Sequence, residues 1–273
     1  MKNDFKIRSI CVVKNEADII EHCLTEAARW SDRIYVYDGE STDGTWEKVL
    51  AMQNQKIIPW KRHNKAYHDC LRGEVYNAFK DKAKKGDWWC RLDADEFYLD
   101  SPRDFLARVK PQYHVVWGIA IDYYLTHGDR DYLDFTQPIS QLLPELKYYK
   151  VEHSEAKFFR HRPGLVWHDE HAALPKHMGV VNRERILYQH YKYRTPDQIQ
   201  TRLDTRQESK EKGSEKWSQA IAKHWQDVLV SSQELSYDNQ NKHHIDTAKL
   251  PAHIESLPKR TMKKFMHGVG IWS

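Results

Sequence analysis

The chain has 273 residues, 40% of them hydrophobic, which suffices for one large α/β domain or for one domain with an appended subdomain. Its 43 basic and 39 acidic residues give a formal net charge of +4. This mild excess does not call for nucleic acid as a partner, although it favours anionic ligands and surfaces.

The sequence carries no targeting or membrane-spanning signal. No apolar run approaches the roughly 20 residues of a membrane span, and the N-terminus lacks the apolar core of a signal peptide. The four cysteines have no Cys-x-x-Cys spacing and lie mostly in strand or helix patterns, which favours reduced core thiols over disulfides or a zinc site. We therefore expect a cytoplasmic protein.

The first hundred residues alternate between strand and helix patterns. Strands are predicted for residues 7–13, 33–37 and 56–60, and a fourth begins at Trp88. Helices are predicted after Asn15, a good helix cap, and over about 45–52 and 65–85. Strict alternation implies right-handed crossovers and a mostly parallel sheet with flanking helices, so the predicted fold class is α/β.

Polar side chains follow all four of these strands, where each strand ends. Asn15 and Glu16 come after the first strand, Asp38 closes the second, Arg62 and His63 follow the third, and Asp93 and Asp95 close the fourth. In parallel sheets ligands bind outside the carboxyl ends of the strands, so these side chains are candidates for one site. The alternatives are a helix cap at Asn15 and turn chemistry at Asp38.

The pair Asp93 and Asp95 is the most informative feature. If the chain is extended there, both carboxylates point the same way while Ala94 turns toward the protein. Such a pair suits a hard divalent cation, which completes its coordination with water and phosphate oxygens. The alternative is a solvated acidic turn at a strand end.

The second half reads as a helix over about 101–109 and a buried strand over 114–121, followed by aromatic and histidine-rich segments. Aromatic faces suit sugar rings, although tyrosine clusters also serve as core packing. A further helix is predicted from Thr195 and Pro196, with Ile199, Leu203 and Arg206 on it.

Three blocks in register carry a family resemblance. They are Val12 to Asp18, Tyr37 to Thr45, and Asp87-Trp88 followed by Leu92 to Glu96. In order and spacing they resemble the family 2 glycosyltransferases of the GT-A fold, and the chain is similar to bacterial lipopolysaccharide and capsule glycosyltransferases. The resemblance implies a catalytic domain at 1–205, with a nucleotide-sugar half at 1–100 and an acceptor half at 101–205, and a helical extension at 206–273.

The resemblance also implies a site. Its Asp-x-Asp motif would hold Mn²⁺ or Mg²⁺, which stabilises the departing diphosphate. His190, in a segment similar to His-Tyr-x-Tyr-Arg, would complete the metal shell, and Lys192 or Arg194 would pair with phosphate oxygens. The implied metal ligands are Asp93, Asp95 and His190, and the implied nucleotide-sugar contacts are Val13, Asn15, Glu16, Asp38, Arg72, Asp93 and Ala94.

The segment Trp167 to His171 offers the general base. An inverting transfer needs a group that accepts the proton of the acceptor hydroxyl. Glu170 is favoured, because similar lipopolysaccharide-core transferases carry an acidic residue in a comparable His-Glu segment, and Asp169 is its rival. The alternative is a polar loop without chemistry.

The resemblance implies a metal-dependent transfer from a nucleoside-diphosphate sugar to a saccharide or lipid-linked saccharide, with inversion, in surface polysaccharide biosynthesis. One alternative is a sugar-nucleotide pyrophosphorylase, although the segment after the first strand lacks the Gly-rich loop of that class. The other is a nucleotide or carbohydrate-binding module without turnover.

The tail from Pro258 to Met266 mixes basic and apolar residues as an interfacial helix does. Peripheral contact with the inner face of the cytoplasmic membrane is one hypothesis for it. A packed or disordered tail is the other.

Overall fold

The computed structural model describes residues 5–63, 70–167, 173–211, 222–240 and 242–272. The strands are β1 Ile7–Val13, β2 Arg33–Asp38, β3 Ile57–Arg62, β4 Trp88–Leu92, β5 Glu96–Tyr98, β6 Val115–Tyr124, β7 Tyr148–Arg160, β8 Ile186–His190 and β9 Ser236–Tyr237. The helices are α1 Ile20–Trp30, α2 Thr45–Ala51, α3 Leu71–Phe79, α4 Pro102–Arg108, α5 Asp129–Tyr132, α6 Ile139–Leu142, α7 Pro196–Glu211 and α8 Leu257–Gly268. Short 3-10 turns occupy Lys80–Lys82, Leu143–Glu145, Trp225–Val228, Ser232–Glu234 and Thr247–Lys249.

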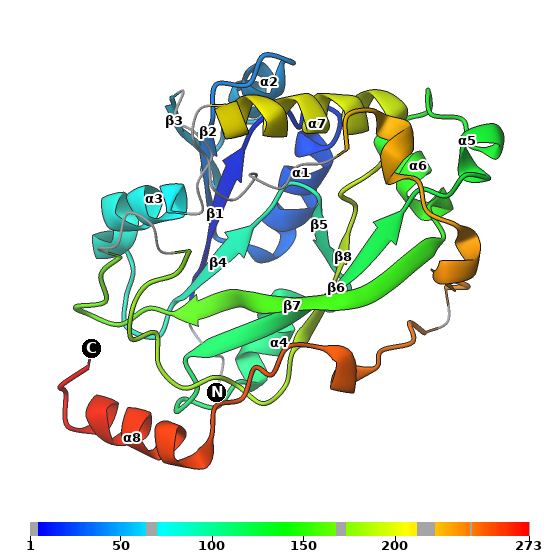
Figure 1. Cartoon of the computed structure of the whole chain (residues 1–273). Coiled ribbons are helices and arrows are strands. Elements are labelled where there is room, and N and C mark those ends of the chain that lie inside the picture. Colours follow the sequence, from blue (N-terminus) through cyan, green and yellow to red (C-terminus); the bar gives the residue numbers. More distant parts are fainter. Residues whose placement is uncertain (1–4, 64–69, 168–172, 212–221, 241, 273) are drawn as a thin grey trace.

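These strands form one sheet in the order β3-β2-β1-β4-β7-β6-β8-β5, with β9 paired to β7 (Figure 1). The first four neighbours, β3 to β4, run parallel. Beyond β4 the sheet is mixed, because β7 is antiparallel to β4 and β6 while β8 is parallel to β6. The α/β class predicted from the sequence is confirmed, and its parallel part is the N-terminal half.

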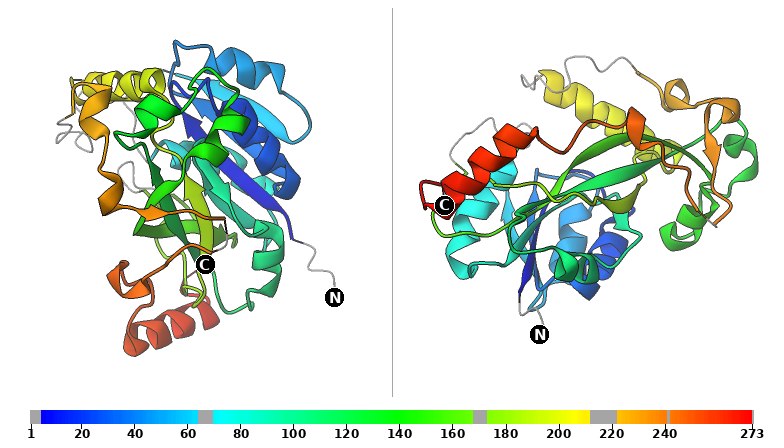
Figure 2. Two further views of the ribbon diagram at one scale, coloured as in Figure 1. Left: turned by 90° about the vertical axis from the view of Figure 1, so that its right-hand side faces the viewer. Right: turned by 90° about the horizontal axis from the view of Figure 1, so that it is seen from below.

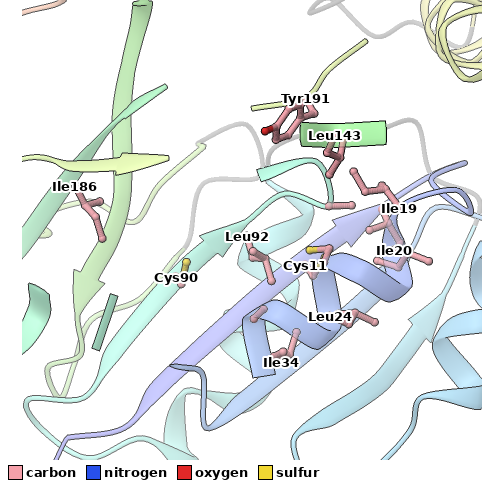
Figure 3. Packing of buried hydrophobic residues seen from close by; sticks show 14 of the residues in the cluster. Cys11, Ile19, Ile20, Leu24, Ile34, Cys90, Leu92, Leu143, Ile186 and Tyr191 are labelled. Atoms are coloured by element: carbon pink, nitrogen blue, oxygen red, sulfur yellow. The ribbon is translucent and has the colours of Figure 1, made fainter. Parts of the chain in front are cut away.

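The parallel half is covered by helices on both faces because its strands are apolar on both faces. In β1, Cys11 and Val13 belong to the cluster that includes α1 and α2, whereas Ile10 and Val12 pack in the cluster with α3. Figure 3 shows the first cluster, where Ile20 and Leu24 of α1 lie against the sheet. Burial on both faces is typical of parallel strands.

Several predicted boundaries differ from the structure. The helix after β1 begins at Ile20, and Asn15 has a left-handed φ of 55°, so the prediction that Asn15 caps this helix is wrong. The expected boundary between residues 205 and 206 falls inside α7, which runs through it without a break. None of the helices in the described ranges combines the length and apolar composition of a membrane span.

In the mixed half of the sheet, the backbone of Gly118 lies very close to the side chain of Tyr188. A Cβ placed on Gly118 of β6 would lie 2.7 Å from Cε1 of Tyr188, a fully buried ring that cannot swing away. We expect Gly118→Ala to destabilise the fold by about 1–3 kcal/mol through overpacking, and to lower the melting temperature by several degrees.

Gly128→Ala is the matched control, because a Cβ there meets no atom closer than 3.7 Å and φ is −72°. Thermal unfolding followed by circular dichroism compares the two variants. Equal melting temperatures for both would contradict the packing account.

Candidate functional site

A cavity of about 490 Å³ lies at the carboxyl ends of β1 and β4, beside α7. Eight of the nucleotide-sugar and metal residues predicted from the sequence line it, namely Val13, Asn15, Glu16, Arg72, Asp93, Ala94, Asp95 and His190. Its other charged lining residues are Lys14, Arg91, Glu96, Glu155, Lys192, Arg202 and Arg206. The topology therefore brings most of the predicted residues to one place.

The two aspartates lie in a turn and not on a strand. β4 ends at Leu92, and the backbone N–H of Glu96, which opens β5, donates to the Asp93 carbonyl at 3.3 Å. The prediction that both carboxylates point the same way from an extended chain is therefore wrong. The turn directs them to different partners, so they have different roles.

Asp93 is held by cations of the protein. Arg72 of α3 donates to Oδ1, and the Lys157 ammonium lies 3.4 Å from Oδ2. Burial raises the pKa of the Asp93 carboxyl, but the nearby Arg72 and Lys157 cations outweigh it and hold that pKa well below its ordinary value. Asp93 is thus an ionised carboxylate with both oxygens facing a cation.

Lys157 of β7 occupies the centre of an acidic cluster. Carboxylate oxygens of Asp93, Glu96 and Glu155 lie within 4.8 Å of one another, a spacing that suits a metal ion. The fully buried Lys157 Nζ lies 2.6 Å from Glu96 Oε1 and 2.6 Å from Glu155 Oε1. Because the Lys157 ammonium lies among these oxygens and pairs with them, we interpret this cluster as an internal ion-pair network.

Asp95 meets a histidine that is itself held by a second carboxylate. Its Oδ2 lies 3.5 Å from His190 Nε2 and 2.9 Å from a guanidinium nitrogen of Arg202 on α7. The other ring nitrogen, His190 Nδ1, is 2.6 Å from Asp122 Oδ1. Burial lowers the pKa of His190, but Asp95 and the hydrogen bond to Asp122 raise it to about 10.

Glu16 is joined to the second half of the chain by arginines. The fully buried Arg194, after β8, donates to Glu16 at 2.6 Å and to both Asp18 oxygens at 2.7 and 2.8 Å. Arg202 reaches the other Glu16 oxygen at 3.2 Å. Arg194 is therefore engaged within the protein, so the idea that it pairs with phosphate oxygens is wrong, whereas Lys192 lines the cavity.

The side chain of Asn15 connects the loop after β1 to the loop after β2 and to α7. Its side-chain oxygen accepts from Thr42 N–H, and its amide nitrogen donates to Thr205 Oγ1 on α7, both at 2.9 Å. Asn15 adopts a left-handed backbone conformation, which asparagine tolerates well because its short polar side chain can form hydrogen bonds with nearby groups. Asn15 thus positions α7 over the cavity.

Asp38 is not among the residues that line the cavity. It is fully buried, and its oxygens accept from the Ser41 backbone N–H at 2.8 Å and the Ser41 hydroxyl at 2.6 Å. In this structure Asp38 shapes the turn after β2. The two candidate bases, Asp169 and Glu170, lie outside the described residues.

Sequence reasoning did not single out Lys157, Glu155 or Arg202. Lys157 and Glu155 lie on β7, a 13-residue strand whose charged positions give no sign that they point into the protein. A signal did exist for α7, because Arg202 and Arg206 are four residues apart and share one helix face. That face lines the cavity.

No family model matches the sequence, and no curated protein matches it. Among solved structures, mannosyl-3-phosphoglycerate synthase from Rubrobacter xylanophilus is 18% identical over 52% of this chain and 47% of that one, with a TM-score of 0.31. Glucosyl-3-phosphoglycerate synthase from Mycobacterium tuberculosis, in complex with Mn²⁺, UDP and glucosyl-3-phosphoglycerate, is 16% identical over 58% of this chain and 57% of that one, with a TM-score of 0.32. The chain thus spans about half the length of these structures, and its chemistry has to be inferred from its own side chains.

The Lys157 network generates a stability prediction. Lys157→Met removes the ammonium group that faces Asp93, Glu96 and Glu155. It leaves the buried Glu96 without its ion-pair partner, while Arg72 and Arg91 still pair with Asp93 and Glu155. Removing one partner of a buried ion pair lowers the free energy of unfolding by about 3–5 kcal/mol, so we expect a large drop in the midpoint of urea unfolding.

Lys150→Met is the control for this change. Lys150 lies on the same strand, is partly exposed, and pairs with Glu234 only at 3.8 Å. Its loss should cost less than about 1 kcal/mol. A Lys157→Met variant as stable as Lys150→Met would show that the network is not essential.

Proposed function

We propose that the protein is a glycosyltransferase that moves a sugar from a nucleoside-diphosphate sugar to a saccharide or lipid-linked saccharide acceptor, with inversion, with the help of Mn²⁺ or Mg²⁺. The observation that carries the proposal is the chain of contacts from Asp122 through His190 to Asp95, whose last two members line a cavity that also holds Lys192, Arg202 and Arg206. The proposed cellular role is surface polysaccharide biosynthesis in the cytoplasm, as in the lipopolysaccharide and capsule transferases that the sequence resembles.

Asp95 and His190 fit a divalent cation. The 3.5 Å between Asp95 Oδ2 and His190 Nε2 suits two ligands of one ion, and carboxylate and imidazole are both ligands for Mn²⁺. Histidine ligands usually bond to a carboxylate through their other ring nitrogen, which is the contact that Asp122 makes. Asp93 fits less well, because Arg72 and Lys157 face its two oxygens.

The basic lining residues fit a diphosphate. Lys192, Arg202 and Arg206 line the cavity near the Asp95 turn, and guanidinium groups match phosphate oxygens in charge and geometry. A bound divalent ion would neutralise negative charge that develops on the departing diphosphate. The arginines of α7 would bind oxygens of the same group.

The residues that we propose for acceptor activation come from the sequence alone. Glu170 is the proposed base, with Asp169 as its rival, and either would take the proton of the acceptor hydroxyl. The last described residue before them, Trp167, accepts a hydrogen bond from Asn77 of α3 through its carbonyl at 2.8 Å. That contact places the start of this segment beside the helix that carries Arg72.

The donor is tested by thermal shift with UDP-, GDP-, TDP- and CMP-sugars, each with and without Mn²⁺. We expect stabilisation by one nucleotide class, larger with Mn²⁺, because ligands that bind only the folded state stabilise it. No shift with any of the four would count against the donor site. Binding without nucleotide release in the presence of saccharide acceptors would identify a binding module.

The metal ligands are tested by Asp95→Asn and Asp122→Asn. Asp95→Asn should abolish measurable Mn²⁺ binding in calorimetry, while Asp122→Asn, which leaves both ligands but loosens the imidazole, should weaken it about 10–100-fold. Asp100→Asn is the control, an exposed aspartate just after β5. Unchanged Mn²⁺ affinity in Asp95→Asn would refute the assignment.

A further inference from the structure

The C-terminal helix α8 presents its polar side to the body of the protein. Lys263 Nζ donates to the Gly179 carbonyl at 3.1 Å and pairs with Glu255 at 2.7 Å. The His267 ring lies against His114, with centroids 5.0 Å apart. Arg260, Lys263 and His267 share one helix face and are partly buried, so this face is the docked one.

The apolar side of α8 faces solvent. Phe265 is 62% exposed, Met262 49%, and Val269, just after the helix, 52%. These three residues follow helical spacing and form a stripe roughly opposite the docked face. Leu257 and Ile271, at the two ends of the helix region, are also exposed. An amphipathic helix normally buries its apolar stripe, and here the arrangement is reversed.

Basic residues flank the exposed stripe. Lys259 and Lys264 are both exposed, and they lie on either side of the apolar positions around the helix axis. Asp and Glu are absent from the sequence of α8. A helix with an apolar stripe and basic flanks matches the interface of a bilayer that carries anionic lipids, where the stripe enters the acyl boundary and the lysines meet headgroup phosphates.

We propose that α8 docks the protein on an anionic membrane surface through Met262, Phe265 and Val269, with Lys259 and Lys264 at the headgroups. The charge complementarity of the flanking lysines favours a lipid surface over a second copy of the chain, whose own α8 stripe would bring like charges together. The inference stands on α8 alone and does not depend on the proposed transferase activity.

The position of α8 allows docking without covering the cavity. In Figure 1 and in the left view of Figure 2, α8 lies at the edge of the molecule at the end opposite α7. The cavity is lined by residues of α7 and by the turn after β4. A bilayer against α8 therefore leaves the cavity open to water.

The test is co-sedimentation of the full chain with phosphatidylcholine vesicles that contain or lack phosphatidylglycerol. We expect binding to the anionic vesicles only. Met262→Ser with Phe265→Ser should abolish it, and each of Lys259→Gln and Lys264→Gln should weaken it about fivefold, the effect of one charge at such a surface. All four positions are exposed, and melting temperatures check that the variants fold.

Tyr132→Ser is the matched control, because Tyr132 is 88% exposed on α5, away from α8. It should bind anionic vesicles like the wild type. Absence of vesicle binding by the wild type, or equal binding by the Met262 and Phe265 double variant, would overturn the proposal. A wild-type dimer that this double variant dissociates, without vesicle binding, would replace the membrane with a second copy.

Discussion

The buried guanidinium of Arg194 joins the two halves of the molecule at the cavity. It binds Glu16 and Asp18, which follow β1, from a position just after β8, more than 170 residues later. Removing either side would leave a desolvated charge unpaired, which proteins tolerate poorly. The cavity depends on this contact, because one wall comes from the loop after β1 and the other from β8 and α7. The arginine that resembled a phosphate ligand is therefore a structural one.

The turn after β4 gives the carboxylates of Asp93 and Asp95 different partners. Asp93 faces Arg72 and Lys157 and stays within the ion-pair network, whereas Asp95 faces His190 and Arg202 at the cavity. Two acids one residue apart would repel each other if they shared a single site without an ion. With separate cations, each is ionised before any ligand arrives. The proposed metal thus has to compete for Asp95 with Arg202 and with the protonated His190 ring.

The N-terminal half could be predicted because its strands are continuous apolar runs separated by helices, and β1, β2 and β4 appear where the pattern placed them. The mixed half could not, because β7 carries charges such as Glu155 and Lys157 that look solvated in sequence and are buried by pairing with each other. The same reason hid Arg202 of α7, which pairs with Glu16 and Asp95. Local patterns indicated that Asp93 and Asp95 matter, but only tertiary contacts separate their roles.

Lys157 also constrains how this sequence can change over evolution. Loss of Glu155 first leaves the lysine with Glu96 and Asp93, so the buried ammonium still has a carboxylate partner. Loss of the lysine first leaves the buried Glu96 without its ion-pair partner, whereas Asp93 keeps Arg72 and Glu155 keeps Arg91. A tolerated route to a different interior therefore begins with an acid and ends with the base, and the positions in the turn after β4, on β5 and on β7 are expected to vary together and not one at a time.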